Sequence, residues 1–283
     1  MYIMKACGAC GSEKVSKSPA ILAPFIADRV FDWAPVEITA EWGLKSTKVG
    51  VAHCRLNSVG CHDCASIFSD LRFCAEEVEK LYRDYRGHEY TSSRTAYEPE
   101  YKAKAKTLHS RYPYLLDAES WIKGYLTPQS ILDWGGGNGL NSMFKYAGNE
   151  LYVHDVSGVA IGRGIKSFFE HDCDVNFDLV TCNQVLEHVS EPLNVLTEIK
   201  RLMSDDTWLY FDLPYEKIMH DSIPIIERLK RKRHWHEHIN FFTEKGVRQL
   251  VNRADLNVID LRIVSATDTP GEDLIFQTLV RKR

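Results

Sequence analysis

The stretch RHWHEHINFF, residues 233–242, places three histidines and a glutamate within five positions. Imidazole and carboxylate groups bind metal ions and transfer protons near neutral pH. The metalloprotease pattern H-E-x-x-H needs a histidine where this chain has Asn240, so that kind of metal site is excluded. If the segment is extended, its residues alternate between two faces, with His234, His236 and His238 on one and Trp235, Glu237 and Ile239 on the other.

Two C-x-x-C pairs near the start of the sequence form a second group that can do chemistry. Cys7 and Cys10 make the first pair, and Cys61 and Cys64 make the second. Each pair can form a tight turn that directs two thiolates at one tetrahedral ion, as in a zinc ribbon. Four thiolates leave zinc no open position for water or substrate, so the predicted Zn²⁺ is structural.

Alternatives stay open for these cysteines. They are either zinc ligands, two unrelated reduced pairs, or a redox-active C-x-x-C. The insert between the pairs, about 50 residues, is longer than a compact ribbon requires, so other residues of the insert are alternative ligands: His53, Cys54 and His62. Glycines adjoin both pairs, where such turns need a positive φ: Gly8, Gly11 and Gly60.

The segment SILDWGGGNG, residues 130–139, has the pattern of an apolar strand that ends in a glycine-rich turn, with a helix expected after it. Glycines let the backbone approach a ligand closely, and a helix N-terminus offers free N–H groups. The dinucleotide-binding turn G-x-G-x-x-G/A needs a small third residue. Counted from Gly135 that residue is Leu140, and counted from Gly137 it is Ser142, which disfavours NAD.

Two carboxylates accompany this turn. Asp133 precedes the glycines, and Asp155 ends the next predicted strand, 20 residues beyond Gly135. At that distance an acid can accept hydrogen bonds from ribose hydroxyls; the alternative is a solvent-facing acid at a strand end. A carboxylate at the turn suits a cationic ligand that carries an amino group better than a pyrophosphate.

Apolar runs alternate with helical patterns through the second half of the chain, which predicts an α/β fold with a mostly parallel sheet. After the strand at the glycine turn, the strand-like runs are 150–155, 177–183, 207–213, 257–265 and 273–283. We expect three parts: a zinc-binding module over 1–75, a helical connector over 76–128 that contributes to the active site, and a ligand-binding domain over 129–283.

The bulk properties exclude several classes of protein. Hydrophobic residues make up 44% and charged residues 26%, so neither a disordered nor a membrane protein is indicated. The net charge of -4 argues against a nucleic-acid partner bound through the overall field. The first residues show no signal peptide, and we expect a cytoplasmic protein.

The ordered motifs ILDWGGGNG, VHDVS and FDLVTCNQVLEHVSEPLNVLTEIKRLM resemble those of class I S-adenosylmethionine-dependent methyltransferases, over about 129–283. The resemblance implies a doubly wound seven-stranded sheet, with Gly135 and Gly137 beside the methionine part of the cofactor. It implies that Asp133 contacts this part or supports the loop, and that Asp155 binds the ribose. Asn183 and Gln184 would line the cofactor, and Asp172 is one candidate on the adenine side.

Over nearly the whole chain, the sequence is similar to zinc-containing sugar C-methyltransferases that act on nucleotide-linked keto-deoxysugars. The matching segments are the four cysteines, Tyr90-Thr-Ser-Ser93 and HEHINFF. The resemblance implies methylation of a carbon beside a ketone, with five residues at the active site: Tyr90, His188, His236, Glu237 and His238.

Removing a proton beside a ketone needs a base with a near-neutral pKa and donors for the enolate oxygen. We expect His238 to be the base, oriented by Glu237, with Tyr90 or His236 near the oxygen. The alternative is that HEHINFF caps a strand and orders a loop. Trp235 stands where these enzymes tend to have tyrosine, and an indole cannot act as an acid or base.

Other acceptors therefore stay open: an O- or N-methylated sugar, another small metabolite, or RNA or protein recognised by the zinc ribbon. The basic run at 228–233 is either a solvated face or a grip for an acceptor's diphosphate. A protein that keeps the fold without turnover is a further alternative, and the presence of Asp133 and Asp155 argues against it.

Overall fold

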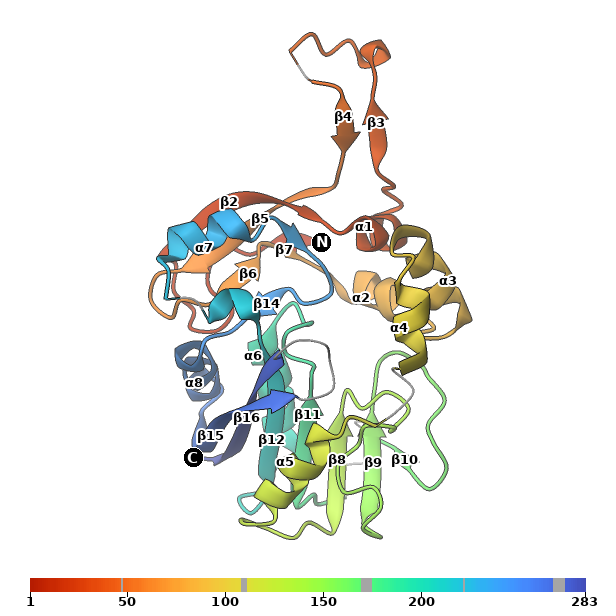
Figure 1. Cartoon of the computed structure of the whole chain (residues 1–283). Helices are drawn as coiled ribbons and strands as arrows, with labels where there is room; N and C mark the ends of the chain where they lie inside the picture. Colours follow the sequence, from red (N-terminus) through yellow and green to blue (C-terminus); the bar gives the residue numbers. More distant parts are fainter. Residues whose placement is uncertain (47, 108–110, 169–174, 221, 267–272) are drawn as a thin grey trace.

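The computed structural model describes residues 1–46, 48–107, 111–168, 175–220, 222–266 and 273–283. Asp172, the adenine-side candidate, lies outside these ranges. The second half of the chain folds around a seven-stranded sheet, seen in the lower part of Figure 1. Its order is β10-β9-β8-β11-β12-β16-β15. The strands are β8 Ser130–Trp134, β9 Glu150–His154, β10 Lys166–Ser167, β11 Leu179–Asn183, β12 Trp208–Tyr215, β15 Leu256–Ala266 and β16 Asp273–Lys282.

The neighbours β10, β9, β8, β11 and β12 are all parallel, whereas β16 is antiparallel to β12 and β15 is antiparallel to β16. The central strand β11 is buried at four of its five positions, as a strand covered on both faces should be. The predicted α/β class with a mostly parallel seven-stranded sheet is confirmed.

Helices cover both faces of this sheet. On one face, α6 (Pro192–Leu202) and α8 (Glu244–Arg253) pack apolar residues such as Leu196 and Leu250 onto the strands. On the other face, α5 (Tyr114–Ile122) buries Leu115 and Ala118. Successive side chains of β12 point to opposite faces, so Phe211 joins the first core and Tyr210 the second.

The helix expected after the glycine turn is not formed. Residues 135–148 make consecutive turns instead. Phe144 and Gly148 both have positive φ angles, 58° and 77°, which no continuous right-handed helix contains. The prediction of a helix N-terminus at this turn is therefore wrong.

A second sheet lies above the carboxyl ends of the parallel strands and contains strands from both halves of the chain (Figure 1). Its order is β13-β2-β5-β6-β14, where β13 and β14 come from the histidine-rich segment. The strands are β2 Val15–Leu22, β5 Arg55–Cys61, β6 Ile67–Ser69, β13 His234–Trp235 and β14 Asn240–Phe241. The segment that carries His234 to His238 is therefore built into the N-terminal sheet.

Four helices flank the second sheet: α1 Pro24–Phe31, α2 Ala75–Tyr82, α3 His88–Tyr97 and α4 Tyr101–Thr107. They share a core with that sheet, in which Phe25, Tyr90 and Trp235 are fully buried. Short elements complete the fold: β1 Tyr2–Ile3 paired with β7 Leu71–Arg72, helix α7 Ile225–Arg231, and the 3-10 turns Ala40–Trp42 and Lys217–Met219. The expected connector is therefore divided: α2, α3 and α4 pack with the N-terminal sheet, whereas α5 packs on the large sheet.

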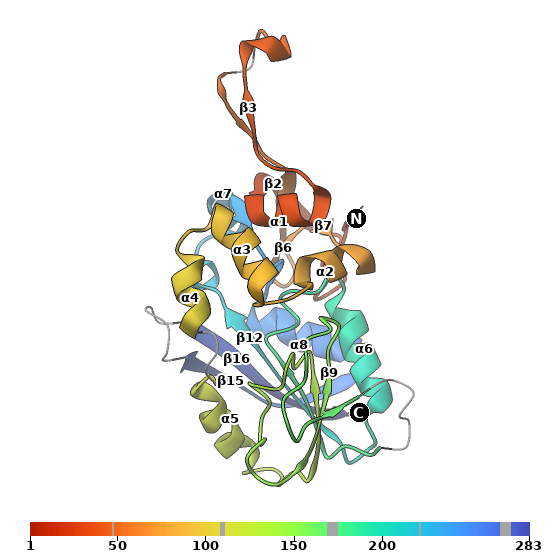
Figure 2. The same cartoon turned by 90° about the vertical axis from the view of Figure 1, so that its right-hand side faces the viewer.

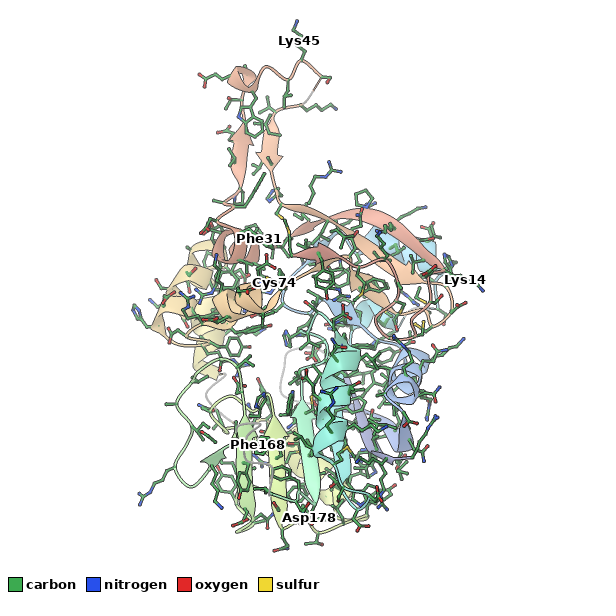
Figure 3. All side chains as sticks on the ribbon, turned by 180° about the vertical axis from the view of Figure 1, so that it is seen from behind. Lys14, Phe31, Lys45, Cys74, Phe168 and Asp178 are labelled. Atoms are coloured by element: carbon green, nitrogen blue, oxygen red, sulfur yellow. The ribbon has the colours of Figure 1, made fainter. Side chains whose placement is uncertain are left out.

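A hairpin of β3 (Val36–Ile38) and β4 (Gly50–Ala52) projects from the body as an arm (Figures 1 and 2). Lys45 lies at its tip in Figure 3, and Asp178, at the amino end of β11, lies at the opposite end of the molecule. Across the described residues, none of the helices has the length and apolar character needed to span a membrane.

Candidate active site

The glycine turn closes directly over the end of β8. Gly135 has a φ of 77°, and its N–H donates to the carbonyl oxygen of His154 on the neighbouring strand, at 2.7 Å. A Cβ on Gly135 would lie 2.5 Å from Val185, and a Cβ on Gly136 would lie 2.4 Å from Asp133. Larger residues at these two positions would therefore collide with the turn's own support.

Gly137 differs from the neighbouring glycines because the position where a side chain would lie is open space. Its φ is 56°, and a Cβ there would meet no atom within 4 Å. Its N–H donates to Asp155 Oδ2 at 2.7 Å, while Ser157 N donates to Asp155 Oδ1 at 2.8 Å. The turn and Asp155 thus form one unit at the ends of β8 and β9, with free space beside Gly137.

Asp133 is buried beneath this unit and supports the loop. It accepts hydrogen bonds from Ser142 Oγ at 2.6 Å and Thr181 Oγ1 at 2.8 Å. Asn183 Nδ2 lies 3.3 Å away. Burial raises the pKa of Asp133, although these donors oppose the shift. Of the two roles expected for this acid, the hydrogen bonds favour support of the loop over contact with a ligand.

Gln184 faces the interior rather than the open side of the turn. Its backbone N–H and Nε2 donate to Asp212 Oδ1, at 3.1 and 2.8 Å. Burial raises the pKa of Asp212 to about 6. Asn183 is hydrogen-bonded to Asp133. Asn183 and Gln184 therefore support the edge of the sheet against which a ligand would lie.

The five residues expected at the acceptor side divide into two groups. In the first, Glu237 is buried and accepts hydrogen bonds from the hydroxyl of Tyr90 and from Arg94, the latter at 2.8 Å. His236 bridges two carboxylates, with Nε2 at 2.6 Å from Glu98 and Nδ1 at 3.5 Å from Glu237. Arg94 and Glu98 complete this network and were not predicted from the sequence.

The charges in this network are mutually satisfied. Burial alone would raise the pKa of Glu237, but the hydrogen bond from His236 and the charge of Arg94 outweigh burial and hold that pKa well below its usual range. Burial likewise opposes a charge on His236, yet its bonds to Glu237 and Glu98 raise its pKa. Glu237 is therefore an ionised anchor for Tyr90, Arg94 and His236.

In the second group, His188 and His238 face each other, with ring centroids 4.7 Å apart. His238 Nδ1 lies 2.7 Å from Glu216 Oε1, and the buried Glu187 lies beside both histidines. The expectation that Glu237 orients His238 is wrong, because Glu237 is engaged with Tyr90 and Arg94 and the orienting carboxylate is Glu216.

Burial shifts the pKa values of this second group. It raises the pKa of Glu187 to about 8 and, together with the charge of His238, lowers that of His188 to about 3. Burial opposes a charge on His238, but the hydrogen bond to Glu216 and the charge of Glu187 raise its pKa. Glu216 directly follows β12, so an acid at the carboxyl end of a parallel strand was the sequence signal for it.

Trp235 takes no part in either group. It is fully buried in the N-terminal sheet, and its indole Nε1 donates to Ser58 Oγ at 2.8 Å. The neighbouring basic run lies on and after α7: Lys230 pairs with Glu227, and Arg233 donates to Ser18 and Pro19. Trp235 thus points away from both groups. The predicted alternation is wrong for His236, because His236 lies in one network with Glu237 and apart from His238.

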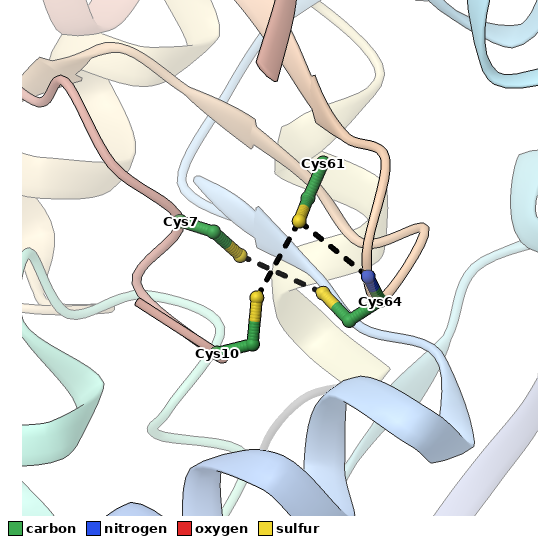
Figure 4. Close-up of side chains that lie close together, drawn as sticks. All are labelled: Cys7, Cys10, Cys61 and Cys64. Atoms are coloured by element: carbon green, nitrogen blue, oxygen red, sulfur yellow. Dashed lines mark hydrogen bonds between the residues drawn. The ribbon is translucent and has the colours of Figure 1, made fainter. Parts of the chain in front are cut away.

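The four cysteines of the C-x-x-C pairs meet in space (Figure 4). Their sulfur atoms lie within 4.8 Å of one another, with Cys7 and Cys64 3.6 Å apart and Cys10 and Cys61 3.4 Å apart. Sulfur atoms around one tetrahedral zinc lie about 3.8 Å apart. The donor set and its spacing therefore fit Zn²⁺.

The two cysteine turns have the same backbone pattern. Gly11 N donates to Cys7 O at 2.7 Å, and Ala65 N donates to Cys61 O at 3.0 Å. Gly11 and Ala65 both have positive φ, 78° and 61°. The expected positive φ at Gly8 and Gly60 is wrong. Gly60 is required for packing, because a Cβ there would lie 2.6 Å from Ile225.

The alternative ligands do not join this cluster. The four-thiolate group contains only residues of the two pairs, and His62 is bonded to Ser16 at 2.8 Å. The cluster lies against α8, where Arg253 donates to the carbonyl oxygens of Gly8 and Ala9. The N-terminal turns are therefore fixed to the large sheet as well as to each other.

Comparison with known proteins agrees with the fold. The sequence pattern of the family described as "Methyltransferase domain" matches residues 94–261, which is more than half of the chain. The chain belongs to this family. The predicted S-adenosylmethionine-dependent methyltransferase class is thus confirmed at the level of the family.

Individual relatives of the chain carry more specific names than the family. The chain is 30% identical over 128 residues to a ubiquinone biosynthesis O-methyltransferase of Paraburkholderia phymatum, covering 38% of this chain and 54% of that protein. It is 26% identical over 184 residues to the enzyme of that name in Paraburkholderia phytofirmans, covering 56% and 78%. The first match thus spans about half the length of the relative.

A solved structure shares the fold at low identity. The 1,6-didemethyltoxoflavin-N1-methyltransferase of Burkholderia thailandensis, solved with S-adenosylhomocysteine, superposes with a TM-score of 0.50 and 16% identity. The match covers 78% of this chain and 97% of that chain. This agreement supports the class I methyltransferase fold.

The raised pKa of His236 predicts a pH effect on stability. A group whose pKa is higher in the folded state stabilises the fold fully below its unfolded value, about 6.5, and loses that contribution as the pH rises through the folded value. The melting temperature of the wild type should exceed that of His236→Gln by about 1–4 °C at pH 6, with a smaller difference at pH 9. A difference in melting temperature that is the same at pH 6 and pH 9 would contradict a raised pKa of His236 in the folded protein.

Proposed function

We propose that this protein transfers the methyl group of S-adenosylmethionine to a small molecule. The observation that carries the proposal is the open side of Gly137, next to Asp155, at the end of the sheet that the histidines face. A bound sulfonium supplies an activated methyl group. The chain's own residues then have to hold the donor, position the acceptor and take up a proton.

On the donor side, we propose that Gly135 and Gly137 lie along the methionine part and that Asp155 accepts hydrogen bonds from the ribose hydroxyls. Asp155 already holds the Gly137 N–H, so ribose binding and the shape of the turn are coupled. Asp133, Asn183 and Gln184 support this surface from below.

Replacing Asp155 with alanine tests the donor site. Loss of hydrogen bonds to a charged acceptor should weaken binding of S-adenosylhomocysteine about 10- to 100-fold. The affinity is measured by titration calorimetry, and the exposed Asp206, at the opposite end of the sheet, provides the control Asp206→Ala. An Asp155→Ala affinity equal to that of wild type would show that the ribose lies elsewhere.

On the acceptor side, we propose methylation of an acidic position, most concretely the carbon beside the ketone of a nucleotide-linked keto-deoxysugar. His238 takes the proton through Nε2, while Glu216 accepts the hydrogen bond from Nδ1. Tyr90, His236 and Glu237 act as a rigid wall, because their polar groups are bound to one another and to Arg94.

A second candidate is O-methylation of a sugar or another metabolite. Two observations favour it: the relatives named as ubiquinone biosynthesis O-methyltransferases, and Trp235, which replaces the expected tyrosine and points away from the site. A labelled-methyl assay against nucleotide-linked keto-sugars, their reduced forms and RNA separates these cases. Label in RNA alone would refute a small-molecule acceptor.

We also propose that Zn²⁺ at the four cysteines is structural, and we keep the three-part division at residues 75 and 128 as a proposal. The zinc cluster ties the N-terminal turns to α8. It thereby fixes the sheet that carries the histidines above the glycine turn.

A further inference from the structure

Glu187 is a fully buried carboxylate with no role in the reaction proposed above. Its two oxygens have no hydrogen-bond donor among the described residues. An ionised carboxylate without a donor or a counter-charge is unfavourable in a protein interior. It is therefore either protonated or balanced by positive charge that its surroundings supply.

The neighbouring histidines direct lone pairs toward this carboxylate. Nδ1 of His188 lies 3.1 Å from the carbonyl oxygen of Glu237 and 3.1 Å from the hydroxyl of Tyr82. The carbonyl can only accept and the hydroxyl can accept, so a hydrogen on Nδ1 satisfies both partners. Nε2 of His188 then has a lone pair, and it lies 3.7 Å from Glu187 Oε1. That separation exceeds a hydrogen bond.

The second imidazole is held in the same way. Nδ1 of His238 lies 2.7 Å from the Glu216 carboxylate, which accepts its hydrogen and leaves Nε2 as the free nitrogen. One ligand atom from each of Glu187, His188 and His238 falls within a group whose members all lie within 4.8 Å of one another. The side chains of His188 and His238 are 17% and 38% exposed, so the group is reachable from solvent.

We propose that Glu187, His188 and His238 bind a divalent transition-metal cation, at a site separate from the four cysteines. Two imidazoles and one carboxylate on one side of an ion leave other positions open for water or an acceptor oxygen. Each histidine is oriented through its second nitrogen by a carbonyl or a carboxylate, as metal-binding histidines usually are. Ligand atoms around such an ion lie about 3–3.5 Å apart, so the group contracts by roughly 1 Å on binding.

The mixed nitrogen and oxygen donors suit Mn²⁺, Fe²⁺, Co²⁺ or Zn²⁺ and are poor for Mg²⁺. The cation would coordinate an oxygen of the acceptor beside the methyl donor. The inference goes beyond the proposed function, because in the loaded protein His238 is a ligand instead of the base. Methyl transfer by the cation-free protein does not depend on it.

The experiment begins with the metal content of the purified full chain. We expect either a second equivalent of metal beyond the zinc of the cysteines, or uptake of one equivalent of added Mn²⁺. Uptake of Mn²⁺ is measured by electron paramagnetic resonance and calorimetry. Thiolates prefer zinc to manganese, so Mn²⁺ reports the mixed site. Glu187→Gln should weaken Mn²⁺ binding, or the retention of the second metal, at least about 100-fold, and Glu216→Gln about 10- to 100-fold.

Glu191→Gln is the matched control, since Glu191 lies four residues further along and binds the hydroxyl of Tyr2. Binding of S-adenosylhomocysteine is measured on every variant and shows that each is folded. A single equivalent of metal with no Mn²⁺ uptake, or uptake unchanged in Glu187→Gln, would overturn the cation site and leave the proposed function standing. If the wild type does not bind S-adenosylhomocysteine, the proposed function is refuted instead.

Discussion

Replacing His238 with alanine is expected to slow methyl transfer by about 10²- to 10⁴-fold, the usual contribution of a general base. In the cation-free protein it should also stop exchange of the acceptor's acidic hydrogen with deuterated solvent. The reason is that Glu216 holds Nδ1 of His238 and leaves Nε2 to accept a proton. His188, the other imidazole of the pair, is less well placed. The exchange is followed by NMR of the acceptor.

His234→Ala is the control for this prediction. His234 comes from the same segment, is exposed, and belongs to neither histidine group. Its rate and exchange should match those of the wild type. Continued exchange in His238→Ala, with cofactor affinity intact, would assign proton removal to another group.

Replacing both Cys61 and Cys64 with serine should remove about one zinc per chain and lower the melting temperature by roughly 10 °C or more. These residues are buried in one core with α8 and the large sheet, so losing the ion loosens the contact between the two sheets. Metal analysis and calorimetric melting measure the two effects.

Cys54→Ser provides the matched control. Cys54 lies in the same part of the chain, outside the four-thiolate group, and was an alternative ligand in the sequence. Its substitution should leave the zinc content unchanged. Full zinc content in the Cys61 and Cys64 double variant would show that the metal, if present, is held elsewhere.

The acceptor side is assembled from distant parts of the chain. Ile239 N and Asn240 N both donate to the carbonyl oxygen of Glu187, at 2.8 and 3.0 Å, which joins the histidine segment to the loop after β11. Arg72 donates to Asn240 from the N-terminal part at 2.8 Å. The proposed donor site at β8 and β9 and the proposed acceptor site at the histidines therefore meet at one interface between the two sheets.

The sequence by itself determined the features that depend on local pattern. The six strand-like runs became β8, β9, β11, β12, β15 and β16, because runs rich in apolar and β-branched residues favour strands. The glycine turn with Asp155 and the two C-x-x-C turns were also predicted, since their chemistry is set by residues a few positions apart.

Only the tertiary structure decided which partners these residues have. Glu216 and Glu187, 22 and 51 positions from His238, meet it because separate strands end at one edge of the sheet. Glu237, its neighbour in sequence, points to the opposite face and binds Tyr90 and Arg94 instead. His236, the residue before Glu237, lies in the same network as Glu237, whereas His238 does not. The partner of a catalytic side chain is therefore set by the packing of elements and not by its position along the chain.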